Sequence, residues 1–130
     1  AVELLHKLAD QNIFLGVATG KGRRGLDKVL AATGLADLFT ATRCADECHS
    51  KPHPQMLEEL ISFCGVEADS TMMIGDTEFD LLMAHNAGAK SVAVTHGAHA
   101  LDRLQACKPF HIVDDLFALD EWLHGNNQRF

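Results

Sequence analysis

Short apolar runs alternate along this chain with segments of helical periodicity, and no other feature limits its fold as strongly. The run at 13–18 is apolar without polar alternation, which is typical of a strand covered on both faces. Such strands, alternating with helices, predict a mostly parallel sheet flanked by helices. We expect one α/β domain over residues 1–130 with a Rossmann-like sheet, its strands at 13–18, 38–42, 71–74, 91–95 and 111–113 and its helices at 2–10, 24–33, 54–64, 79–87, 100–107 and 114–125.

Composition favours a soluble, cytoplasmic protein. The chain is 47% hydrophobic and 22% charged. No apolar run approaches the roughly 20 residues that cross a bilayer, and residues 1–20 lack the layout of a signal peptide. The net charge is −7, and the basic residues form no stripe, the densest stretch being KGRR at 21–24. These features argue against nucleic-acid and membrane partners, although a basic cluster after a glycine suits a small anion.

The chain has four cysteines, which we expect to be reduced because a domain with this much apolar content needs no disulfides. Cys44, Cys48, His49 and His53 together resemble a zinc cluster. Their spacing, C-x3-C-H-x3-H, lacks the gap that separates the ligand pairs of a zinc finger. A loop with a small buried cysteine is the favoured interpretation, and a zinc-binding domain ranks far lower.

Ligands of parallel α/β sheets bind beyond the carboxyl ends of the strands, so the residues after each strand are the candidates for a site. Strand 13–18 leads into Thr19, Gly20 and Lys21, and strand 91–95 leads into Thr95, His96 and Gly97. Lys51 lies at the same edge, in a loop before a helix that returns to the sheet. Taken singly, Thr19 is an ordinary strand-end residue and Lys51 a solvated loop residue.

Two carboxylates follow the strand at 71–74. Gly75 lets the backbone turn so that Asp76 points into the site. Acids are seldom placed at the inner end of a buried strand without a partner, which favours a functional role for Asp76. Asp80 comes about one helical turn later, where it can touch a metal shell or orient Lys51. Thr77 and Asp80 also have the spacing of a capping-box variant, which does not exclude function.

Together these residues fit the chemistry of phosphoryl transfer. A phosphoryl group requires positive charge and hydrogen-bond donors, which Lys51, the Thr19 hydroxyl and nearby backbone N–H groups can supply. Mg²⁺ prefers oxygen ligands, keeps several waters and takes one or two protein carboxylates. We expect Mg²⁺ as cofactor and a small phosphorylated metabolite as partner, with Asp76 and Asp80 at the metal, Thr19, Gly20 and Lys21 at the substrate, and Thr19, Lys51 and Asp80 as catalytic residues.

Three motifs, in this order, resemble the haloacid dehalogenase superfamily of phosphatases: VATGK at 17–21, KPHP at 51–54 and GDTEFD at 75–80. The stretch AHNAGAKSVAVTHG at 84–97 is similar to the subfamily that includes phosphoglycolate phosphatase and β-phosphoglucomutase. The resemblance runs from about residue 1 to residue 125.

The resemblance implies a role for each matching residue. Thr19 would bind the phosphoryl group, and Lys51 would stabilise an aspartyl-phosphate and its nucleophile. Asp76 would hold Mg²⁺, and Asp80 would support the metal shell. The true dehalogenases of this superfamily use no Mg²⁺, and receiver domains of response regulators carry similar residues in another order. The motifs therefore favour a phosphatase.

One motif of the superfamily has no match here, an apolar strand that ends in D-x-D-G-T. Its first Asp is the nucleophile and its second the general acid/base, and D-x-D occurs nowhere in the 130 residues. We expect this chain to be a core-domain portion that lacks the first, central strand and the helical cap, and to be inactive alone. The alternative is a non-catalytic remnant that binds phosphate or a partner.

The missing strand would lie between strands 13–18 and 71–74, leaving two apolar edges open. Three outcomes would cover them: the two strands close on each other, a second copy pairs with them in a homo-oligomer, or a strand-completing segment fills the gap. We expect the isolated chain to be oligomeric or marginally stable.

Overall fold

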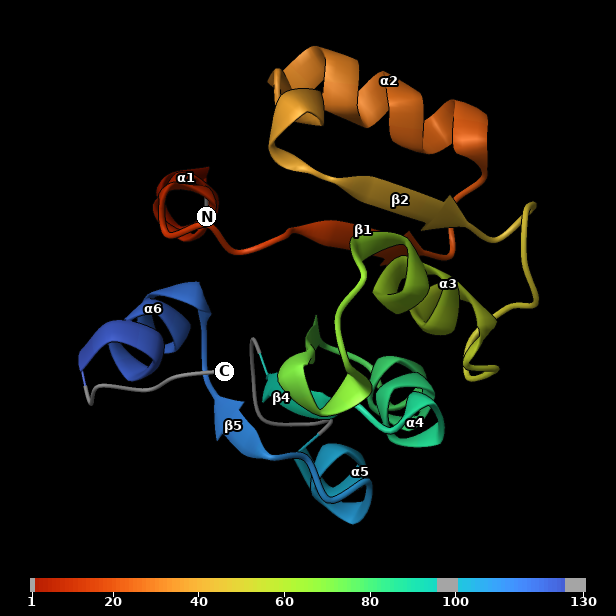
Figure 1. The fold of residues 1–130 in the computed structure, drawn as a ribbon. Coiled ribbons are helices and arrows are strands. Elements are labelled where there is room, and N and C mark those ends of the chain that lie inside the picture. Colours follow the sequence, from red (N-terminus) through yellow and green to blue (C-terminus); the bar gives the residue numbers. More distant parts are fainter. Residues whose placement is uncertain (1, 96–100, 126–130) are drawn as a thin grey trace.

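The computed structural model describes residues 2–95 and 101–125, in which helices and strands alternate in the predicted order (Figure 1). The helices are α1 (Val2–Asp10), α2 (Arg23–Thr33), α3 (Gln55–Cys64), α4 (Glu78–Ala87), α5 (Leu101–Ala106) and α6 (Leu116–Gly125), with short 3-10 helices η1 (Ala36–Leu38) and η2 (Ala68–Ser70). The strands are β1 (Gly16–Thr19), β2 (Ala41–Cys44), β3 (Met72–Gly75), β4 (Lys90–Val94) and β5 (His111–Val113). No described helix has the length and apolar character needed to span a bilayer.

Glycines end three of the helices. Gly34, Gly65 and Gly88 follow α2, α3 and α4 with φ of 70°, 69° and 79°, a left-handed conformation that only glycine adopts without steric cost. Each glycine N–H donates to a carbonyl of the preceding turn, so the helix end is satisfied.

Two predicted strand boundaries are too early. Residues before β1 complete the end of α1, where Asn12 has φ of 62° and the Ile13 N–H donates to the Leu8 carbonyl at 3.3 Å. Residues before β2 form η1, so β2 begins at Ala41. In both places a helical turn uses residues whose apolar character alone predicts a strand.

The strands form two parallel sheets rather than one. β1 pairs with β2, from Gly16 opposite Ala41 to Thr19 opposite Cys44. The second sheet has the order β3-β4-β5. In the described part of the chain no backbone pairing joins β1 to β3, so of the three outcomes considered for the open edges, closure of these two strands on each other is not observed. An α/β fold with parallel strands and flanking helices is confirmed.

Side chains of β3 are more exposed than those of β4, because one edge of β3 has no paired strand among the described residues. β4 lies between two neighbours, and Val92, Ala93 and Val94 are buried. Among the described strands β3 has a neighbour on one side only, and its Ile74 is 39% exposed. This contrast is what a sheet that lacks one strand beside β3 would show.

Three apolar clusters build the core. The first packs α1 and α6 on one face of the β3-β4-β5 sheet, and another packs Leu81 of α4 and Leu104 of α5 on Ala93. The third links the two sheets through α3 and α4. Its buried members are Met56, Leu57, Met83 and Ala84, and Ala18 of β1 and Met73 of β3 pack against them. This third cluster holds the ends of β1 and β3 on one shared core.

Candidate active site

Lys51 and Asp80 form an ion pair beside the carboxyl end of β3. Lys51 comes from the loop before α3, and its Nζ donates to Asp80 Oδ1 in the first turn of α4. The Lys51 and Asp80 side chains are 19% and 7% exposed. At such burial a charge is costly without a partner, so each group requires the other.

Thr77 holds the second oxygen of Asp80. Its hydroxyl donates to Asp80 Oδ2 at 3.1 Å and accepts the Asp80 N–H at 3.2 Å, which makes Thr77 the N-cap of α4. The capping-box interpretation of Thr77 and Asp80 is therefore correct in part, because the carboxylate binds the hydroxyl of the cap rather than its backbone N–H. Capping and orientation of Lys51 coexist at Asp80.

Gly75 leaves the space that Asp80 occupies. A Cβ at Gly75 would lie 2.3 Å from the Asp80 Cβ and 2.8 Å from its Oδ2. The backbone at Gly75 is not in a left-handed conformation, so this glycine is required by contact rather than by φ. The last residue of β3 and the first turn of α4 approach closely only because this position has no side chain.

Gly75→Ala should therefore displace Asp80 and separate it from Lys51. We expect the free energy of unfolding to fall by about 1–3 kcal/mol, as for overpacking of a buried site. Denaturant titration followed by circular dichroism measures it. The matched control is Gly20→Ala, since a Cβ at Gly20 would meet nothing within 4 Å. Equal stability of the two variants would contradict the close approach.

Asp76 is exposed, and its side chain makes no hydrogen bond or ion pair with another described residue. The expectation that Asp76 sits at the inner end of a buried strand is wrong, because β3 is paired on one side only in the described residues and Asp76, which follows the buried Gly75, is exposed. An exposed carboxylate without a protein partner fits Mg²⁺, which keeps several waters and uses few protein ligands. Asp80 fits direct ligation less well, since Lys51 and Thr77 occupy both of its oxygens.

Thr19, Gly20 and Lys21 form the turn that leaves β1. The Thr19 hydroxyl accepts the Lys21 N–H at 3.1 Å, and the Lys21 carbonyl accepts the Ala45 N–H at 3.0 Å. Gly20 and Lys21 are exposed, as expected for a segment that would contact a ligand. Within residues 2–95 and 101–125, no hydrogen bond joins this turn to Lys51, Asp76 or Asp80.

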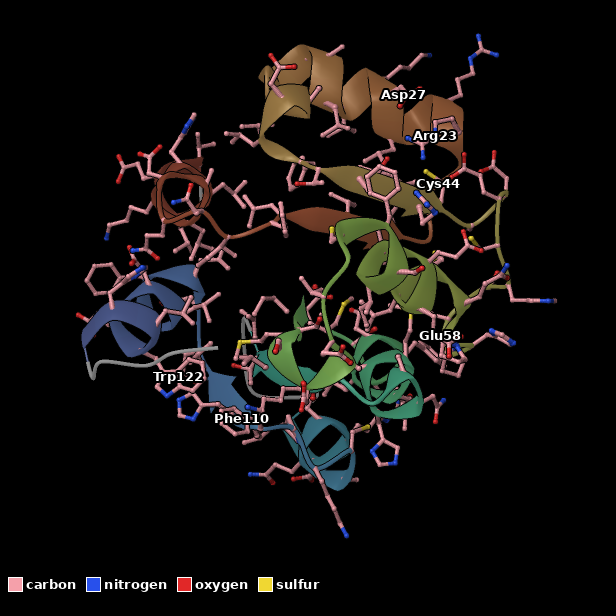
Figure 2. All side chains as sticks on the ribbon, in the orientation of Figure 1. Arg23, Asp27, Cys44, Glu58, Phe110 and Trp122 are labelled. Carbon is pink, nitrogen blue, oxygen red and sulfur yellow. The ribbon has the colours of Figure 1, made fainter. Side chains whose placement is uncertain are left out.

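Arg23 is engaged inside the protein rather than free for an anion, although it belongs to the basic stretch KGRR. Its guanidinium donates to Glu47 through Nε at 3.1 Å and Nη2 at 2.9 Å, and to the Thr42 hydroxyl through Nη1 at 2.7 Å (Figure 2). It also contacts Asp27 at 3.2 Å. The hydrogen bond from Arg23 lowers the pKa of Glu47, and the same bond raises the pKa of Arg23. The α2 N-terminus is also occupied, since Asp46 accepts the Arg23 N–H at 3.0 Å.

Two of the four residues of the zinc hypothesis, Cys48 and His53, have other hydrogen-bond partners for their side chains. Cys44 is fully buried, and burial raises the pKa of its thiol. The Cys48 thiol contacts Glu59 at 3.7 Å, and His53 Nδ1 accepts the Gln55 N–H at 3.1 Å. One group of potential ligands in the described residues, Cys44 with Asp46 and Glu47, is close enough for a metal, but Arg23 already binds both of its carboxylates.

Two residues that the sequence analysis does not single out contact the loop of the Lys51–Asp80 pair. Gln55 and Asn86 bind the loop that carries Lys51. Asn86 lies in the stretch matched at 84–97, whereas Gln55 has no local signal beyond its place at the start of α3. His96 and Gly97 lie outside the described residues.

Comparisons with known proteins agree with the motifs. A family model described as haloacid dehalogenase-like hydrolase matches residues 1–94. The chain is 43% identical over 114 residues to "Probable phosphatase IndB" of Dickeya dadantii, over 87% of this chain and 50% of that protein. It is 33% identical over 124 residues to the phosphoglycolate phosphatase of Rhodospirillum rubrum, over 95% of this chain and 51% of that protein.

A solved structure gives the same result. The crystal structure of a predicted phosphoglycolate phosphatase from Haemophilus somnus matches with a TM-score of 0.82 at 28% identity, over 94% of this chain and 53% of that chain. The chain spans about half the length of the curated relatives it matches. The resemblance inferred from the three motifs is confirmed, and the chain belongs to the haloacid dehalogenase-like hydrolases.

Proposed function

We propose that this chain is the core-domain portion of a Mg²⁺-dependent phosphatase that hydrolyses a small phosphate monoester through an aspartyl-phosphate. The nucleophile would come from a segment outside these 130 residues. The observation that carries the proposal is the buried Lys51–Asp80 pair, held by Thr77 beside the end of β3 and next to the exposed Asp76. A cation that is fixed but still 19% exposed can meet a phosphoryl group at this edge.

In this proposal each residue acts on the phosphoryl group by charge or hydrogen bonding. Lys51 neutralises charge on the phosphoryl oxygens, and Asp80 keeps its ammonium in place. The Thr19 hydroxyl and the Gly20 N–H would bind the remaining oxygens. The Lys21 N–H already donates to the Thr19 hydroxyl, so Lys21 would meet the substrate through its side chain. Asp76 would hold Mg²⁺, which would add positive charge where negative charge develops.

The test compares this chain with the same chain extended upstream in its own gene. Hydrolysis of p-nitrophenyl phosphate is measured with Mg²⁺ for both proteins. We expect activity in the extended protein only, because the 130 residues contain no D-x-D motif. Activity in the short chain that Asp76→Ala abolishes would mean that a resident residue is the nucleophile, and the proposed mechanism would be wrong.

The absence of D-x-D from these residues also favours a second candidate, a non-catalytic module that binds phosphate or a partner. Under this alternative the extended protein binds phosphate without turnover. Calorimetric titration with inorganic phosphate, run beside the activity assay, separates the two functions.

The same pair of proteins addresses the open edges of β1 and β3. We propose that a strand-completing segment or a second copy covers these edges in the whole protein. Light scattering on the 130-residue chain should then show oligomers, whereas the extended form should lose them if its added segment fills the gap. A stable monomer of the short chain would contradict the argument from exposed edges.

A further inference from the structure

The loop that carries Lys51 into the site is held by side chains on both of its flanks. The loop spans residues 49–54 and is the second part of the connection from β2, which ends at Cys44, to α3. Lys51 has a long, flexible stem, and ordering such a side chain costs up to about 2 kcal/mol of rotamer entropy. The Asp80 carboxylate fixes the far end of this stem. The position of the other end, the Lys51 Cα, depends on how firmly the loop backbone is held.

Gln55 holds the loop from the side of α3. Its Oε1 accepts the His49 N–H at 2.7 Å, and its own N–H donates to His53 Nδ1 at 3.1 Å. One residue thus binds the loop two positions before Lys51 and two positions after it. The Gln55 amide is oriented in turn, because its Nε2 donates to Glu59 Oε2 at 2.9 Å.

Glu59 is itself fixed by a charged partner. The Arg43 Nε donates to Glu59 Oε1 at 2.9 Å, and this hydrogen bond lowers the pKa of the Glu59 carboxyl. Glu59 therefore stays ionised and acts as an acceptor for Gln55 through the neutral range. A chain of hydrogen bonds runs from β2 through α3 to the backbone beside Lys51.

Asn86 holds the loop from the side of α4. Its Nδ2 donates to the Pro52 carbonyl at 3.1 Å, directly after Lys51. Asn86 and Asp80 lie on the same helix, so α4 binds both ends of Lys51, the backbone through Asn86 and the ammonium through Asp80. The apolar contacts of Met56 and Leu57 with Met83 and Ala84 keep α3 and α4 in register with each other.

We propose that Gln55 and Asn86 are positioning residues, which fix the loop so that the Lys51 ammonium stays at Asp80 and meets the phosphoryl group. This inference rests on the proposed function for its catalytic meaning. Neither residue touches the reacting atoms. The Gln55 side chain makes two hydrogen bonds and is partly buried, whereas the Asn86 side chain makes one and is exposed, so loss of the Gln55 side chain has the larger effect.

The first test uses the extended protein and p-nitrophenyl phosphate. Gln55→Ala should lower kcat by about 10–100-fold with a smaller change in KM, as for loss of an outer partner of a catalytic group. Asn86→Ala should lower kcat less. Glu58→Ala is the matched control, because Glu58 is exposed in the same turn of α3 and binds no other described side chain; its kcat should not change.

A double-mutant cycle distinguishes positioning from general loosening of the fold. In a Lys51→Ala background, Gln55→Ala should cause little further loss of kcat, because the side chain that Gln55 positions is gone. Multiplicative losses in the double variant would overturn the proposal. If alanine variants unfold, Asn86→Asp replaces them, since it keeps the shape of Asn86 but cannot donate to the Pro52 carbonyl.

The second test uses the 130-residue chain and requires no catalysis. Lys51 is acetylated with limiting acetic anhydride, and its rate is compared with that of Lys28 by peptide mass spectrometry. Gln55→Ala and Asn86→Ala should raise the Lys51 rate several-fold and leave Lys28 unchanged. An unchanged Lys51 rate would refute the positioning role whatever the activity. A raised rate with an inactive extended protein would refute the proposed function and retain the positioning role.

Discussion

Methionine in place of Lys51 should lower the free energy of unfolding of this chain by about 3–5 kcal/mol, the cost of leaving a buried charge without its partner. Methionine keeps the length and apolar stem of lysine but removes the ammonium. Asp80 would then be 7% exposed in its side chain with only the Thr77 hydroxyl at its carboxylate. Urea unfolding followed by circular dichroism measures the change.

Two further variants establish that the loss comes from the pair. Lys21→Met removes an exposed lysine near the end of β1 and should change stability by no more than about 0.5 kcal/mol. Asp80→Asn in the Lys51→Met background removes the orphaned charge and should recover part of the loss. A loss below about 1 kcal/mol in Lys51→Met would mean that the pair behaves like a surface salt bridge.

Local patterns predict most of this fold because local chemistry decides it. Gly34, Gly65 and Gly88 end helices through their own backbone freedom, and Thr77 starts α4 through its own hydroxyl. The two strand boundaries that are wrong are those at which a helical turn competes for apolar residues. A short apolar run is compatible with a strand and with a helical turn. At these two boundaries, hydrogen bonds to the Leu8 carbonyl and within η1 favour the helical turn.

The site is predicted less completely, since burial depends on neighbours that are distant in sequence. The position of Asp76 directly after an apolar strand predicts burial, but the structure leaves Asp76 exposed beside an edge of β3 that no described strand covers. The pairing of Lys51 with Asp80 is one of two roles that the spacing allows, and only tertiary packing selects it. In the sequence, Gln55 and Asn86 resemble solvated helix residues. The periodicity of the apolar residues does not indicate their contacts with residues 49–52.

Asp76→Asn should lower the kcat of the extended protein by about 10²–10³-fold at saturating Mg²⁺, the usual effect of losing one electrostatic contact to a developing charge. Asparagine keeps the size of the side chain and one oxygen but removes the negative charge that would attract Mg²⁺. The measurement is hydrolysis of p-nitrophenyl phosphate over a Mg²⁺ titration, with calorimetry for Mg²⁺ binding. Asp69→Asn, at another exposed aspartate, is the control and should change neither.

The free energy of unfolding should distinguish the Asp76→Asn variant from the Lys51→Met variant. The Asp76 side chain is exposed and binds no other described residue, so Asp76→Asn should leave the free energy of unfolding within about 0.5 kcal/mol. Lys51→Met should reduce both stability and activity, because Lys51 belongs to a buried pair. An Asp76→Asn protein with normal Mg²⁺ dependence would exclude Asp76 as the metal ligand. An Asp76→Asn protein that is destabilised as strongly as Lys51→Met would mean that Asp76 supports the fold rather than the metal.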